Sequence, residues 1–131
     1  MTKKAPYAVL AVFFTWSVLD FVMHRIILGD SYRQTASLWR PVGEMKMGLI
    51  YLGTLIFATV FVAIYTLFFS KKGPLPGLKY GLLLGIGMGF SMGYGSYAVM
   101  PIPFSMAFTW FAGTVIEMLV GGYLVGSIIK Q

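Results

Sequence analysis

Two acidic side chains lie deep inside long apolar stretches and have the clearest chemical potential in the sequence. Asp20 interrupts an apolar run over residues 6–29, and Glu117 lies inside another over residues 104–129. A charge near the centre of a bilayer costs about 2.5–3.5 kcal/mol on insertion scales, so such a group is turned inward, paired or kept neutral. At a rise of ~1.5 Å per residue, the depths of the two carboxyl groups in the membrane differ by only about 7 Å. We therefore expect Asp20 and Glu117 to share one interior site.

Polar, aromatic and small neighbours extend this predicted site. His24 lies four residues after Asp20, which places both on one helix face, and Trp16 lies one turn before Asp20. In the last run, two glycines flank Glu117 at a spacing of four residues and leave room around its carboxyl group. The predicted intramembrane polar site comprises Asp20, His24, Glu117, Trp16, Trp110 and Arg25, and the flanking glycines are Gly113 and Gly121.

Two interpretations of the acid pair stay open. In the functional one, Asp20 and Glu117 bind a cation or a proton, and His24 relays it. In the structural one, the acids form a hydrogen-bonded clamp between helices, with Glu117 protonated and Asp20 paired to His24 or Arg25. Asp20 has basic neighbours and Glu117 has none, while two like charges in a low dielectric repel. We therefore expect Asp20 to be ionised and Glu117 to be neutral.

The same residues allow few cofactors. His24 is the only histidine and the chain has no cysteine, so a bis-histidine haem within one chain is excluded. A methionine such as Met88 or Met92 would have to supply the second ligand, but methionine in apolar segments is mostly a packing residue. We expect no metal site and no cofactor, including haem or copper at His24. No phosphate-binding glycine loop or serine–histidine–acid pattern is present, so the sequence favours a protein that is not an enzyme.

The composition is that of a membrane protein. Of 131 residues, 58% are hydrophobic and only 11% are charged, whereas soluble domains carry about 25% charged residues. The net charge of +6 comes from basic residues between the apolar runs, without a basic cluster interleaved with aromatics. We therefore expect the lipid bilayer as a partner and no nucleic acid.

Four apolar runs are each near or above the ~20 residues that a spanning helix needs. They cover residues 6–29, 48–69, 80–100 and 104–129. The first resembles a signal peptide, but Asp20 interrupts it and no small-residue cleavage site follows, so we expect a retained helix. The predicted fold is all-α: a polytopic membrane protein whose single domain, residues 1–131, forms an antiparallel bundle of four transmembrane helices.

A row of small residues dominates the third run. The glycines that recur every fourth residue are Gly77, Gly81, Gly85, Gly89 and Gly93, with Gly87, Ser91 and Gly95 in a second row. Small residues four apart let another helix approach closely in a membrane. Residues 100–103 form the last connection, which is so short that the third and fourth helices must be antiparallel neighbours. We expect the first row to meet the fourth helix through Gly113, Gly121, Gly122 and Gly126.

Basic residues favour one orientation. With a cytoplasmic N-terminus, the inner side holds Lys3, Lys4, Lys71, Lys72, Lys79 and Lys130, and the outer side holds Arg25, Arg33, Arg40 and Lys46. The excess predicts that both termini are cytoplasmic.

The connections differ in character. Between the first two runs, Asp30 or Ser31 is expected to cap a short helix that continues to Trp39 and ends before Pro41. This helix is either an ordinary surface helix or a lid, with Trp39 as an interfacial anchor. The stretch KKGPLPG, residues 71–77, is predicted to be a turn.

Three stretches resemble a group of small bacterial four-helix membrane proteins of unknown function. They read WSVLDFVMHRIILGDSYRQTASLWRP, EMKMGLIYL and MPIPFSMAFTWFAGTVIEM. The resemblance implies a bacterial inner (cytoplasmic) membrane protein and no particular activity. Small multidrug-resistance transporters are also four-helix proteins of similar length, but they carry their essential glutamate in the first helix. Here the first helix has Asp20 and the glutamate is in the fourth.

Three functions follow as hypotheses. The first is an accessory or scaffold subunit that assembles through its glycine-rich face into a homo-oligomer or a larger membrane complex. The second is a small proton- or cation-coupled transporter that uses Asp20 and Glu117. The third is a haem- or quinone-associated redox subunit built around His24, Arg25, Trp16 and Trp110.

Overall fold

The computed structural model describes residues 2–130, and this range contains helices and connections but no strand. The helices in chain order are α1 (Ala5–Phe21), a π-helical turn η1 (Val22–Ile27), α2 (Gly29–Gln34), two 3₁₀ turns η2 (Ala36–Leu38) and η3 (Val42–Glu44), α3 (Met47–Phe68), α4 (Pro74–Val99) and α5 (Phe104–Ile128). The predicted all-α class is confirmed. So is the number of long apolar helices: α1 with η1, α3, α4 and α5 are each long and apolar enough to cross a membrane.

The turn before α4 is shorter than predicted. Pro74 is the first residue of α4, so residues 74–77 belong to the helix and not to a turn. Proline suits the first helical turn because its missing N–H would have no partner there. The reversal itself depends on Gly73, whose φ of 134° is rarely adopted by residues with a side chain. The Tyr65 hydroxyl holds this turn: it donates to the Gly73 carbonyl oxygen at 3.0 Å and accepts from the Gly73 N–H at 2.8 Å.

The connection between α1 and α3 also differs from the prediction. The predicted helix reaching Trp39 is wrong: α2 ends at Gln34. The Thr35 hydroxyl donates to the Ser31 carbonyl oxygen at 2.8 Å and accepts the Trp39 indole N–H at 2.9 Å. Such a local side-chain bond competes with helix continuation. Asp30 does not cap the helix either, because it lies within α2 and pairs with Arg33.

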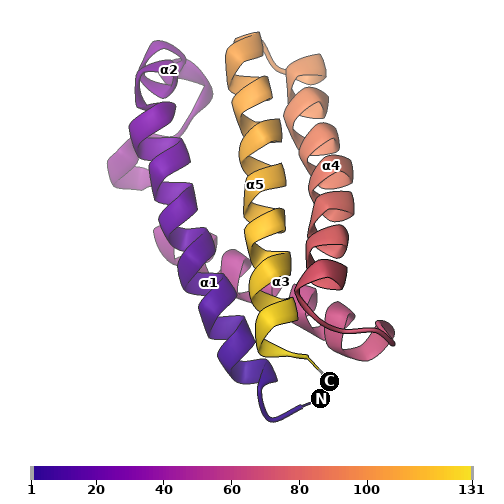
Figure 1. The fold of residues 1–131 in the computed structure, drawn as a ribbon. Helices are drawn as coiled ribbons and strands as arrows, with labels where there is room; N and C mark the ends of the chain where they lie inside the picture. Colours follow the sequence, from indigo (N-terminus) through magenta and orange to yellow (C-terminus); the bar gives the residue numbers. More distant parts are fainter. Residues whose placement is uncertain (1, 131) are drawn as a thin grey trace.

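Three long helices lie side by side in Figure 1, with α5 between α1 and α4, and α3 behind them. The start of α1 and the end of α5 lie at one end of the molecule, and α2 lies at the other. A buried aromatic group joins α1 to α3, where the Trp16 ring stacks on Phe57 at 5.3 Å and meets Phe61 edge-on at 5.1 Å. The Tyr80 hydroxyl of α4 donates to the Phe61 carbonyl oxygen at 2.8 Å and so connects α3 to α4.

The interface between α4 and α5 is made by glycine. The first-row glycines of α4 are all buried: Gly77, Gly81, Gly85, Gly89 and Gly93. Going along α4, they meet α5 in reverse order, from Gly122 and Met118 through Val115 and Phe111 to Ala107. A Cβ atom at Gly85 would lie 2.8 Å from the Val115 Cα, and one at Gly93 would lie 2.8 Å from the Ala107 carbonyl oxygen. The two backbones therefore touch along most of their length.

Candidate polar site between α1 and α5

Two glycines of α5 face α1, and each one receives a side chain. A Cβ atom at Gly121 would lie 2.8 Å from the Trp16 Cζ2 atom, and one at Gly113 would collide with the Met23 sulfur. Gly121 and Gly113 are therefore not part of the α4 interface, contrary to the prediction, and the space beside Glu117 is filled. Trp16 precedes Met23 in the chain but meets Gly121, whereas Met23 meets the earlier Gly113. The two segments therefore run in opposite directions.

This register brings the two acids together. Asp20 of α1 lies between Trp16 and Met23 along the chain, just as Glu117 of α5 lies between the two glycines. The Glu117 carboxyl group lies within interaction range of the Asp20 carboxyl group. One of its oxygens, Oε1, is buried and has no hydrogen-bond partner among the described residues. The Trp16 indole N–H donates to the backbone carbonyl oxygen of Glu117 at 2.6 Å and fixes the helix beside the acid.

A hydrogen-bonded chain leads from the acid pair towards α2. His24 lies in the π-helical turn η1, close enough to Asp20 for the two side chains to interact. Its Nδ1 atom shares a hydrogen bond of 2.7 Å with the Tyr32 hydroxyl, and the Trp110 indole N–H donates to the same hydroxyl at 2.9 Å. Since the indole can only donate, the Tyr32 proton is free to be given to His24. π-helical turns are rare and are frequent at functional sites.

An aromatic cap, consisting of Tyr32, Trp39 and Trp110, covers this end of the site. Trp39 meets Tyr32 edge-on at 5.4 Å and Trp110 edge-on at 6.0 Å. The cap packs on the buried side chains of Met23, Leu28, Ile102, Met106 and Ala107. The connection between α1 and α3 is thus folded onto the ends of α1 and α5 and does not extend freely into solvent.

The electrostatics of the cap keep Tyr32 protonated. Burial raises the pKa of the Tyr32 hydroxyl above its usual value, and the charge of Asp20 acts in the same direction. The hydrogen bond from Trp110 acts in the opposite direction. At neutral pH this hydroxyl therefore keeps its proton and can donate a hydrogen bond to His24.

The structure does not bring Arg25 into the site. Arg25 is exposed and forms no ion pair among residues 2–130, where the one ion pair joins Arg33 to Asp30. Of the two predicted partners of Asp20, neither His24 nor Arg25 forms an ion pair with it among these residues. Within the same range, no group of three or more His, Asp or Glu side chains is arranged to hold a metal ion.

Two residues of the site were missed from the sequence. Tyr32 was overlooked because it belongs to a connection, and only the fold of that connection brings it to His24. Met23 looked like any packing methionine. Its spacing of seven from Trp16, which mirrors the spacing of eight between the two α5 glycines, is the signal that would have found it.

No protein-family model, curated protein or solved structure matches this chain. The assignment of a function therefore depends on the geometry of the site.

Proposed function

We propose that the chain is an antiparallel four-helix protein of the bacterial inner membrane, with both termini in the cytoplasm. Large apolar side chains on the outer surface support insertion, for example Val99, Phe68 and Leu83, which are 82%, 77% and 72% exposed. The lysines that precede α1 and those between α3 and α4 support the orientation, because basic residues favour the cytoplasmic side.

The orientation is tested with single cysteines, since the natural chain has none. Ser37 and Ser70 are both exposed and lie in the two connections predicted to face opposite sides. In intact cells, a membrane-impermeant thiol reagent should label Ser37→Cys and spare Ser70→Cys until the membrane is opened. Labelling of Ser70→Cys from outside would contradict the orientation.

We further infer that the protein is a small transporter that couples the movement of a proton or an inorganic cation to the Asp20–Glu117 pair. The single observation that carries this proposal is the meeting of two carboxyl groups, from α1 and α5, inside segments long and apolar enough to span a membrane. Two carboxylates this close in apolar surroundings do not both stay charged, so the pair retains a proton or binds a cation. Loss of the proton changes the affinity of the pair for a cation, and this dependence is the basis of coupling.

The neighbouring groups support exchange at this pair. Glu117 Oε1 is buried without a partner among the described residues, so it is available to a proton or a cation. His24 and Tyr32 offer a path for a proton towards the α2 end of the molecule, because each can donate and accept. A clamp that served stability alone would be expected to satisfy both carboxylate oxygens.

The test is proton flux in liposomes that contain the purified protein and a pH-sensitive dye. A potassium gradient with valinomycin supplies the driving potential, and sodium or potassium is then added to test for exchange. Glu117→Gln should fold normally and lose nearly all flux, and Asp20→Asn should lose it as well. Glu44→Gln and Asp30→Asn are matched controls, because they make the same changes at exposed positions. Undiminished flux in both membrane variants, or no flux above empty liposomes, would contradict the proposal.

A scaffold that assembles through glycine is a second candidate, and one observation favours it. The first glycine row is occupied by α5, but an added Cβ atom at Gly87 or Gly95 of the second row would meet nothing within 4 Å. This open strip suits a helix of a second subunit. If the strip is an interface, Gly87→Leu should dissociate an oligomer in mild detergent without unfolding the subunit. A uniform monomer in the natural protein would eliminate this candidate.

A further inference from the structure

One end of the molecule is strongly basic. Six lysines belong to it, and the side chains of all four acids lie elsewhere: two in the acid pair and two in the connection between α1 and α3. The lysines are Lys3, Lys4, Lys71, Lys72, Lys79 and Lys130. No acidic side chain neutralises this end, which is independent of the acid pair and of the function proposed for it.

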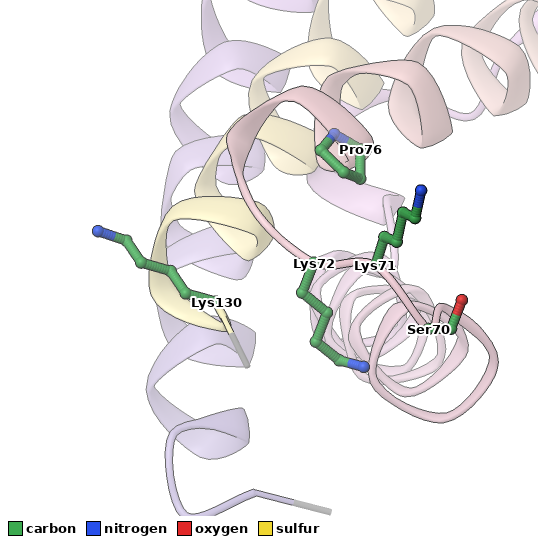
Figure 2. Close-up of a pocket in the computed structure, with 5 residues that line it drawn as sticks. All are labelled: Ser70, Lys71, Lys72, Pro76 and Lys130. Atoms are coloured by element: carbon green, nitrogen blue, oxygen red, sulfur yellow. The ribbon is translucent and has the colours of Figure 1, made fainter.

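A cleft opens among these lysines. It has a volume of about 460 Å³ and is lined by Ser70, Lys71, Lys72, Pro76 and Lys130. Figure 2 shows that Lys71 rises beside Pro76 while Lys72 and Lys130 point to other sides. Lys72 is already engaged, since its ammonium group donates to the Phe69 carbonyl oxygen at 2.5 Å. Lys71 makes no ion pair or hydrogen bond within residues 2–130 and is free to bind a ligand.

A second hollow adjoins the cleft and is partly apolar. Its volume is about 360 Å³, and it shares Ser70, Lys71 and Pro76 with the cleft while adding Lys79 and the rings of Phe68 and Phe69. Phe68 is 77% exposed, and Leu75 on the first turn of α4 is 60% exposed. Cationic groups, a hydroxyl and uncovered apolar side chains therefore lie next to one another at the end of two long apolar helices.

We propose that this paired cleft binds the headgroup of an anionic phospholipid from the surrounding leaflet. Lys71 and Lys79 would bind the phosphate, with the Ser70 hydroxyl as a further donor. The positive end of the α4 dipole lies beside them and favours the same charge. The acyl chains would cover Phe68 and Leu75. Basic pockets at the cytoplasmic ends of membrane helices are suited to anionic headgroups, whereas a soluble anion would leave the apolar half of the site uncovered.

The experiment measures the thermal unfolding midpoint in mild detergent against the mole fraction of added phosphatidylglycerol or phosphatidylcholine. Phosphatidylglycerol should raise the midpoint of the natural protein at a lower mole fraction than phosphatidylcholine does. The double variant Lys71→Gln/Lys79→Gln should need roughly 25-fold more phosphatidylglycerol, from about fivefold per lysine. The control, Lys3→Gln/Lys4→Gln, loses the same charge from the same end and should respond like the natural protein.

Three results would overturn the proposal. Equal losses in the two double variants would show a general effect of charge without a site. Equal responses to the two lipids in the natural protein would show no preference for an anionic headgroup. A midpoint shift of the same size with inorganic phosphate alone, at constant ionic strength, would assign the cleft to a soluble anion. If the Lys71/Lys79 variant does not fold, Lys71→Gln is tested instead by counting retained phosphatidylglycerol molecules in native mass spectrometry, where an unchanged count would also contradict the proposal.

Discussion

The two faces of α5 use glycine for opposite purposes. Towards α4, Gly122 and Gly126 meet the backbone of the partner helix, so an added Cβ atom would strike main-chain atoms of Gly77 and Gly73. Towards α1, Gly121 and Gly113 meet the far ends of the Trp16 and Met23 side chains. One face brings two helices as close as their backbones allow, and the other keeps them apart by the width of a side chain.

This difference in spacing explains where polar groups are found. Where the glycines of α4 meet α5 there is no room for a long side chain, and close packing holds the pair. Between α1 and α5 the wider gap leaves space for two carboxyl groups, an indole and an imidazole. With glycines on two of its faces, α5 packs closely against α4 and still accommodates the side chains of Trp16 and Met23.

The largest effect should come from disrupting the α4–α5 contact. Gly85→Leu should lower the free energy of unfolding by at least about 3 kcal/mol. Its Cβ atom would meet the Val115 backbone, which cannot move aside without separating the two helices. Gly87→Leu, two residues away in open space, should change it by less than about 0.5 kcal/mol. Thermal and denaturant unfolding in mild detergent measure both. Similar stability of the two variants would show that α4 and α5 are not in close contact.

The acid pair should respond asymmetrically. Asp20→Asn should lower the free energy of unfolding by about 1.5–3 kcal/mol, because it replaces the charged carboxylate that faces the Glu117 carboxyl group with a neutral amide. Glu117→Gln imitates a protonated carboxyl group and should cost less than about 0.5 kcal/mol. The unfolding midpoints of both variants are compared with those of Asp30→Asn and Glu44→Gln. A Glu117→Gln protein that fails to fold beside a stable Asp20→Asn protein would reverse the assignment of the charge.

The two glycines that face α1 should differ in tolerance. Gly121→Ala should cost about 1–2 kcal/mol, because a Cβ atom would push the rigid Trp16 ring off the Glu117 carbonyl oxygen. Gly113→Ala should cost less than about 1 kcal/mol, since Met23 is flexible and can move aside. Denaturant unfolding gives the two values. A larger loss at Gly113 would mean that Met23, and not Trp16, sets the spacing between α1 and α5.

Tyr32→Phe should have a smaller effect than Gly85→Leu, Asp20→Asn or Gly121→Ala. Loss of the hydroxyl removes its bonds to His24 and Trp110 and should cost about 1 kcal/mol. Tyr97→Phe is the control at an exposed ring. Because folding raises the pKa of Tyr32, the contribution of its neutral hydroxyl is present below pH 10.0 and declines at higher pH, so the difference between natural and variant protein should shrink there. An equal cost for the two variants at pH 7 would remove Tyr32 from the network.

The long helices could be predicted from the sequence because each is a long, mostly apolar run with a polar flank, and this pattern depends on nothing else in the chain. The predicted depth of the two carboxyl groups in the membrane was enough to pair Asp20 with Glu117, and the structure places them within interaction range. The partners of the glycines could not be assigned in the same way. Gly121 and Gly122 are adjacent and indistinguishable by type, and only the rotation of α5 decides which meets Trp16 and which meets Gly77.

The connections were predicted least well, for a local reason. The Thr35 hydroxyl bonds to the Ser31 carbonyl oxygen and to the Trp39 indole, and such local side-chain bonds compete with helix continuation. The contribution of Tyr32 depends in turn on that local outcome. A residue in a connection becomes part of a site only once the connection has a fixed path.

The π-helical turn at Val22–Ile27 bears on how the length of this chain can vary. In this turn the Leu28 N–H bonds to the Met23 carbonyl oxygen, five residues back, so the helix holds one residue more than an α-helical turn would. Deletion of Ile26, which is 65% exposed, should be absorbed by conversion of the turn to an α-helix. The same deletion before Asp20 would rotate the carboxyl group by about 100° and turn it away from Glu117. Homologous chains that differ by one residue in their first helix should therefore carry the gap at this turn.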